Sequence, residues 1–224
     1  MRKQWTRSTV VLLCALIAAC STNDEAEKIA SVRVINASPD SPVLEFTVGN
    51  LGFRAPFQVG TSFSSDFPGQ QMLSIETTVQ DSTMILMPPL AITIEADHVY
   101  SIIAVNNVAN LDVLINEIDV LPPVANMFRI GFTHASNMTP TVEVYITDPT
   151  ADLINETPDG TIGFGERIQP FLIPAANYRI RLVDPSTTTV IYDTGEVDAS
   201  NTVTANFGLI IIDNVNGVSL SGPA

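Results

Sequence analysis

Apolar and polar residues alternate with a period of two through most of the chain after residue 30. The runs rich in Val, Ile, Thr, Tyr and Phe include SVRVINA, VLEFTV, AITIEA, VYSIIAV, VEVYIT, YRIRLV and TVIYDT. Pro, Gly, Asn, Asp or Ser stands in most of the gaps between these runs. Short runs of this kind, separated by turn-forming residues, are typical of β-sandwiches and barrels. The fifteen prolines oppose long helices, so the pattern predicts an all-β fold.

One part of this pattern occurs twice. Val32–Val48 aligns without gaps on Ile130–Ile146 at a constant offset of 98. The identical pairs are Ala37 with Ala135, Ser38 with Ser136, Pro42 with Pro140 and Glu45 with Glu143. The repeat predicts two tandem β-sandwich domains, at residues 31–121 and 127–218. A proline pair favours an extended connection, so residues 122–126 are predicted to be the linker, and residues 219–224 a C-terminal tail.

The first twenty residues have the three parts of a secretory signal. A positive segment holds Arg2, Lys3 and Arg7, an apolar run follows over residues 9–17, and the small residues Ala18 and Ala19 come last. That run is shorter than the roughly 20 residues that span a bilayer. Residues 1–19 are therefore predicted to be a signal peptide rather than a transmembrane anchor.

The end of this segment, IAAC, resembles the lipobox of bacterial lipoproteins, in which an aliphatic residue and two small ones precede a cysteine. The resemblance implies cleavage before Cys20 and attachment of a diacylglycerol to its thiol, with residues 20–30 as a polar tether. Cys14, the other cysteine of the chain, would be removed with the signal. Ser21 in place of Asp implies sorting to the outer membrane, on its periplasmic or surface face. The alternative is an ordinary signal peptide cut near Ala19, which leaves a free thiol.

The charge balance excludes one class of partner. The chain has 24 acidic and 10 basic side chains and a formal net charge of −14, which loss of the signal peptide would lower to −17. Nucleic-acid affinity depends on Lys and Arg at phosphates, so no nucleic-acid partner is expected. Such a charge favours solubility and repulsion between copies. With 46% hydrophobic and 15% charged residues, the chain is not expected to be disordered.

The first strand–turn–strand unit, VRVINASPDSPVLEFTV, resembles the opening of a family of secreted bacterial domains known as domain of unknown function 4397. Members begin with a strand, a His-Ala-Ser-Pro-Asp-Ala-Pro-like turn and a second strand. Asn36 stands at the His position of the first copy, and residues 37–40 fit the turn; in the second copy His134 fits, while Asn137 and Met138 replace the Pro-Asp pair. The resemblance implies immunoglobulin-like β-sandwiches, often in tandem and lipid-anchored. It implies no activity and no catalytic residues.

Candidate catalytic chemistry is sparse in this sequence. It has no Gly-x-Ser-x-Gly elbow and no complete glycine-rich phosphate loop. The two histidines, His98 and His134, do not occupy corresponding positions in the repeat. Neither a shared catalytic role nor a zinc or copper site of the usual nitrogen and sulfur ligands is expected from them.

An acidic loop of the second copy, Asp148–Gly160, is the best candidate for a metal site. Its oxygen-bearing side chains are of the kind that calcium prefers: Asp148, Asp152, Asn155, Glu156 and Asp159. The EF-hand spacing fails, because Thr150 stands where a second Asp or Asn is needed and Leu153 where the glycine is needed. A loop with solvated charges is the simpler interpretation.

Together these features predict a lipid-anchored, non-enzymatic binding or structural module of the bacterial cell envelope. The lipid on Cys20 would attach it to the membrane, and its loops or sheet edges would face a glycan, the cell wall or an envelope protein. Two alternatives stay open. One is an envelope hydrolase that uses Asp and Glu pairs, such as Asp40 and Glu45; the other is a calcium-stabilised spacer. No cofactor is expected.

Overall fold

The computed structural model describes residues 29–66, 68–118, 122, 124–139, 141–200, 206–214 and 217–221. The predicted signal peptide, Cys20 and most of the predicted tether lie outside the described residues, as do parts of the predicted linker and tail. Within the described ranges, no helix has the length and apolar character needed to cross a membrane.

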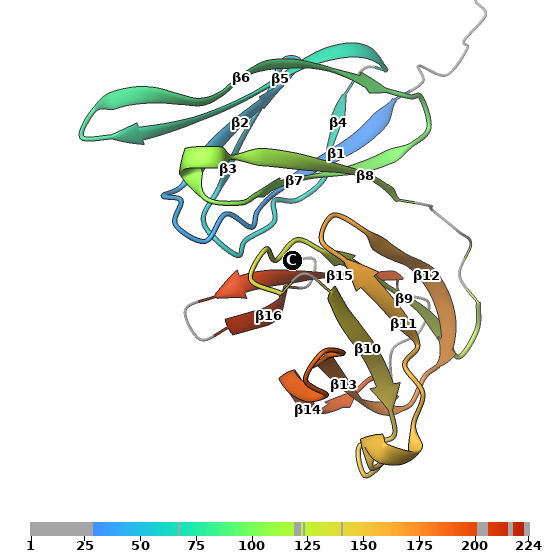
Figure 1. Ribbon diagram of the computed structural model, residues 1–224. Coiled ribbons are helices and arrows are strands. Elements are labelled where there is room, and N and C mark those ends of the chain that lie inside the picture. Colours follow the sequence, from blue (N-terminus) through green and yellow to red (C-terminus); the bar gives the residue numbers. More distant parts are fainter. Residues whose placement is uncertain are drawn as a thin grey trace, which may run out of the picture.

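The described residues form sixteen strands and two short 3₁₀ helices (Figure 1). The strands of the N-terminal half are β1 (Ala30–Asn36), β2 (Leu44–Val48), β3 (Leu51–Ala55), β4 (Ser64–Asp66), β5 (Gly69–Val79), β6 (Ser82–Ile94), β7 (Val99–Val105) and β8 (Asp112–Ile118). Those of the C-terminal half are β9 (Met127–His134), β10 (Thr141–Thr147), β11 (Gly160–Gly163), β12 (Arg167–Pro174), β13 (Asn177–Asp184), β14 (Thr189–Asp198), β15 (Asn206–Asn214) and β16 (Gly217–Ser221). The 3₁₀ helices are Val108–Asn110 and Leu153–Asn155. The prediction of an all-β fold is confirmed.

Each half consists of two four-stranded sheets that share a core. In the N-terminal half the sheets have the orders β4-β1-β7-β8 and β3-β2-β5-β6. Their buried side chains form one cluster, with Val34 and Ile102 from the first sheet and Phe46 and Ile75 from the second. The C-terminal half has the orders β12-β9-β15-β16 and β11-β10-β13-β14, also around one cluster. The immunoglobulin-like detail and the domain limits stay predictions.

The two halves have the same topology, because each strand of the first half corresponds to the strand eight positions later. In each half the first strand pairs in parallel with the seventh, β1 with β7 and β9 with β15. The sequence repeat falls on β1–β2 and β9–β10. The repeated segment is therefore the strand–turn–strand unit that opens each half.

The parallel pairs are buried on both faces. In β7, Ile102 and Ala104 belong to the core of the N-terminal half, whereas Ile103 and Val105 belong to another cluster. We refer to this other set as the junction cluster, because its buried apolar residues come from both halves. It consists of Ile35, Ala37, Ile103, Val105, Ala135, Ile210 and Ile212. Burial on both faces explains why VYSIIAV is almost continuously apolar rather than alternating.

Asn36 and His134 occupy equivalent positions at the ends of β1 and β9, and both are fully buried. Asn36 Oδ1 accepts a hydrogen bond from the Ser38 amide at 3.1 Å, and His134 Nδ1 accepts one from the Ser136 amide at 3.3 Å. Burial lowers the pKa of His134, which favours the neutral imidazole that this bond requires. An asparagine and a histidine therefore make the same turn contact in the two copies.

Asn36→Ala should destabilise the protein by about 2–4 kcal/mol, because it leaves several buried polar groups without partners. The Asn36 Nδ2 donates to the Pro42 and Ala55 carbonyl oxygens, both at 3.2 Å, in addition to the contact with Ser38. The measurement is urea unfolding. The urea concentration at the midpoint should fall, and the slope of the unfolding free energy against urea concentration should stay unchanged. Asn107 is a matched control, since it is exposed and its side chain makes no cap at the first 3₁₀ helix. Asn107→Ala should change stability by less than about 0.5 kcal/mol, and equal effects of the two changes would contradict the assignment.

Candidate functional site

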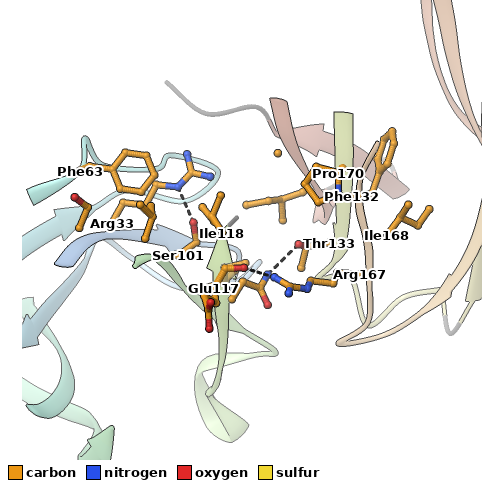
Figure 2. A pocket seen from close by; sticks show the side chains of 17 residues that line it. Arg33, Phe63, Ser101, Glu117, Ile118, Phe132, Thr133, Arg167, Ile168 and Pro170 are labelled. Atoms are coloured by element: carbon orange, nitrogen blue, oxygen red, sulfur yellow. Dashed lines mark hydrogen bonds between the residues drawn. The ribbon is translucent and has the colours of Figure 1, made fainter. Parts of the chain in front are cut away.

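A cavity of about 360 Å³ lies between the two halves (Figure 2). Its walls come mainly from β1, β7 and β8 on one side and from β9, β12 and β15 on the other. Apolar side chains make up much of the lining: Ile103, Ile118, Phe132, Ile168 and Ile210. Pockets for small ligands typically measure about 300–1,000 Å³ and are mostly apolar with a few polar groups. This cavity is therefore large enough for a small organic molecule.

Arg33 is the buried cation of the N-terminal wall. Its side chain lies on the face of β1 away from the sandwich core, and the residue is only 5% exposed. Nε donates to Ser101 Oγ at 2.7 Å, and Cζ lies 4.9 Å from the centroid of the Phe63 ring. Burial lowers the pKa of Arg33, but an arginine keeps its charge in a protein. No Asp or Glu of the described residues forms an ion pair with it.

The opposite wall carries two glycines at the positions equivalent to Arg33 and Ser101. Arg33 pairs with Ser101 in the β1–β7 register, and Gly131 pairs with Gly208 in the β9–β15 register. A Cβ atom on Gly208 would lie 3.8 Å from Arg33 Nη2, so this glycine lies next to the guanidinium. A Cβ atom on Gly131 would come within 3.0 Å of Pro170 Cγ, so β12 can approach only because residue 131 has no side chain. The two copies thus differ where they face each other.

Polar contacts at the cavity cross from one half to the other (Figure 2). Arg167 Nη1 donates to the Glu117 carbonyl oxygen, and Asn116 Nδ2 donates to Thr133 Oγ1 at 2.9 Å. The Glu117 carboxylate lies 2.8 Å from Nδ1 of His98. The two contacts between the halves hold the two walls of the cavity relative to each other.

The carboxylates of the acidic loop are directed toward local groups. Asp148 accepts from the hydroxyl and the amide of Thr150, and these bonds lower the pKa of Asp148. Asp152 caps the second 3₁₀ helix. Asp159 accepts from the Ile146 amide at 2.6 Å, while burial raises the pKa of Asp159. Three of the five predicted calcium ligands therefore serve the fold of the loop itself.

The other two predicted ligands, Asn155 and Glu156, contribute backbone amides to the same turn. In the part of the chain that the structure describes, no three His, Cys, Asp or Glu side chains form a group that could hold a metal ion. Calcium binding by the loop stays a prediction, and a solvated turn accounts for its contacts.

The carboxylates considered for hydrolysis have separate partners. Asp40 accepts from the Val108 amide at 2.8 Å, and the Glu45 carboxylate lies 3.9 Å from Nε of Arg54. Neither residue lines the cavity between the halves. The structure therefore gives these two carboxylates different local contacts and does not join them in one site.

One buried cluster contains the residue types of a serine hydrolase, namely Ser136, His134 and Asp213. Ser136 Oγ donates directly to Asp213, and His134 Nδ1 accepts a backbone amide instead of the serine proton. In the hydrolase arrangement the histidine lies between the serine and the carboxylate. All three residues are at most 1% exposed. The cluster is therefore part of the turn structure and not a catalytic triad.

Arg33 and Ser101 were not among the candidates that the sequence pattern singled out. The signal was present in the repeat, since the gapless alignment sets Arg33 against Gly131 in otherwise apolar strands. The alignment does not indicate that the two positions face one cavity, because that depends on how the halves pack.

The comparison with known families gives one match. Residues 30–145 match the family model described as "Domain of unknown function (DUF4397)". The match begins at β1 and ends within β10, so it covers more than half of the chain and reaches into the second half of the fold. No match is found among curated proteins.

Similar solved structures are distant. A streptococcal virulence factor whose structure concerns alpha-glucan binding has 9% identity and a TM-score of 0.32, over 87% of this chain and 97% of that chain. The family CBM26 module of Eubacterium rectale Amy13K, in complex with maltoheptaose, has 11% identity and a TM-score of 0.30, over 88% of this chain and 97% of that chain. Similarities at this level carry no argument about ligand or activity.

Calcium should leave the stability of the protein unchanged, because the loop carboxylates already accept hydrogen bonds from local donors. The test concentration is about 5 mM calcium, which exceeds the dissociation constants of many extracellular calcium modules. We expect a melting temperature within about 1 °C of the value measured with chelator. The reason is that a ligand raises the melting temperature only if it binds the folded state. The measurement is thermal unfolding of the full chain. A saturable rise that Asp159→Asn abolishes would contradict this expectation and support a calcium-stabilised spacer.

Proposed function

The chain belongs to the family of domains of unknown function 4397, a description that assigns no activity, and we propose that it is a lipid-anchored binding module of the bacterial cell envelope. In this proposal the binding site is the cavity between the halves. The ligand is a small molecule that enters the space between the parallel strand pairs.

The observation that carries the proposal is the buried Arg33 in a cavity whose opposite wall has a glycine, Gly208, next to the guanidinium. A cavity that served only packing would be filled, because voids in protein interiors are costly and rare. Here the absence of a side chain at Gly208 leaves space beside Arg33 Nη2, whereas the space at Gly131 is taken up by Pro170 of β12. An apolar lining with a few polar groups suits the binding of small molecules.

The cavity suits a compact ligand with an apolar body better than an extended glycan chain. Its lining includes several isoleucines and two phenylalanines, Phe63 and Phe132. Binding of a glycan, the cell wall or an envelope protein at loops and sheet edges stays a separate prediction. A catalytic role gains no support from the carboxylate contacts or from the buried Ser136–Asp213 pair.

Membrane attachment in this proposal rests on the sequence alone. The lipobox-like IAAC predicts lipid on Cys20. Each buried methylene contributes about 0.8 kcal/mol, so two or three acyl chains hold a protein far more firmly than one. With Ser21 after the cysteine, we propose the outer membrane as the location.

A side chain placed in the cavity should weaken the binding of a neutral probe. Gly208→Val adds three carbon atoms beside Arg33, in an extended strand that tolerates valine. We expect the affinity for 2-naphthamide to fall about tenfold or more, which is about 1.4 kcal/mol. The measurement is calorimetric titration of the membrane-extracted full chain, with the same detergent in protein and titrant.

Gly52→Val is the matched control, because a Cβ atom at Gly52 in β3 has nothing within 4 Å. It should bind 2-naphthamide as the wild type does. Absence of binding by the wild type, or an equal loss in both variants, would overturn the cavity as the binding site.

The lipid anchor has its own test. Intact mass of the membrane-extracted protein should show a species that begins at Cys20 and carries acyl chains, and Cys20→Ser should lack it. The reason is that only the thiol of Cys20 can form the thioether to diacylglycerol after removal of Cys14 with the signal. An unmodified wild-type species released from the membrane would refute the anchor and leave the cavity proposal untouched.

A further inference from the structure

Arg33 differs from the other arginines of the described residues in what its guanidinium contacts. The other five pair with a carboxylate or donate to a backbone carbonyl oxygen: Arg54, Arg129, Arg167, Arg179 and Arg181. Arg33 donates through Nε to a hydroxyl, the Ser101 Oγ. Among the described residues, no carboxylate or carbonyl oxygen accepts from its Nη atoms. Its paired Nη donors are therefore available to the cavity.

The surroundings of the guanidinium leave its edge open. The guanidinium lies over the Phe63 ring, at 4.9 Å from Cζ to the ring centroid. This cation–π contact supplies no oxygen acceptor to the N–H donors of the guanidinium. Across the cavity Gly208 has no side chain, and a Cβ atom built there would have only Arg33 Nη2 within 4 Å, at 3.8 Å. A planar acceptor can thus reach the edge from the cavity.

We propose that the ligand of this cavity is a small carboxylate with an aromatic or aliphatic body, whose two oxygens accept hydrogen bonds from the Nη atoms of Arg33. The inference rests on the proposed function, since it takes the cavity as the binding site. Carboxylates match the arginine fork with two parallel bonds. A buried cation without a counter-ion is costly, and a carboxylate would remove that cost while the apolar walls contact the body of the ligand.

The other charges at the cavity are compatible with an anion. Arg167 is a second cation on the opposite wall, and it lies across the cavity from Arg33 in Figure 2. Glu117 is the acidic residue of the lining, and its carboxylate is directed to His98 at 2.8 Å. The carboxylate of this lining residue therefore lies beside a histidine and forms no ion pair with Arg33.

The test compares two probes that differ in charge but hardly in shape, 2-naphthoate and 2-naphthamide. For the membrane-extracted full chain we expect the carboxylate to bind about tenfold more tightly than the amide, which is about 1.4 kcal/mol. Arg33→Met keeps an apolar side chain of similar length, so it should still bind 2-naphthamide and lose the preference for 2-naphthoate. Arg33→Lys should keep part of the preference, because it retains the charge without the fork.

Arg54→Gln is the control, since Arg54 is exposed on β3 and pairs with Glu45 outside the cavity. It should keep the full preference for the carboxylate. If wild type binds both probes equally, the carboxylate inference is wrong while the cavity remains a binding site. If Arg33→Met keeps the preference, the assignment to Arg33 is wrong. If neither probe binds the wild type, the proposed function itself fails.

Discussion

The apolar contact between the two halves is the constraint on which the cavity depends. Side chains alternate across a strand, so β1 and β7 each send one set of residues into their own core and the other set toward the second half. Arg33 shares its face of β1 with Ile35 of the junction cluster. The packing that buries Ile35 therefore also buries the guanidinium. The walls cannot separate without exposing the junction cluster to water, which opposes any opening of the cavity along this contact.

The two copies of the fold agree where a turn must be held and differ where the copies meet. Asn36 and His134 make the same contact with a backbone amide, although one is an amide side chain and the other an imidazole. Arg33 and Gly131 stand at equivalent positions, and where Arg33 extends toward the cavity, Gly131 is covered by Pro170 of β12. A tandem repeat of identical copies would place an arginine on both walls or on neither. The difference between the copies is what makes a cavity with one buried cation.

The sequence predicted the parts of the structure that local patterns determine. Alternation predicted strands, and the gapless repeat located the strand–turn–strand unit that opens each half. Parallel pairing of β1 with β7 joins residues nearly 70 positions apart, for example Arg33 with Ser101, and no local pattern indicates such a partner. In the acidic loop, composition predicts oxygen ligands but does not indicate local partners. Backbone amides and a hydroxyl donate hydrogen bonds to Asp148, Asp152 and Asp159.

The charge of the protein adds a condition on any carboxylate that Arg33 binds. A net charge of −14 repels anions at long range, whereas the contact with Arg33 acts only inside the cavity, where the dielectric constant is lower. The apolar body of the ligand must therefore supply much of the affinity. Amphiphilic carboxylates concentrate at membranes, and in the anchored form the tether of residues 20–30 would hold the first strand within roughly 35–40 Å of the lipid. In the anchored form, the membrane and the cavity would therefore favour the same class of ligand.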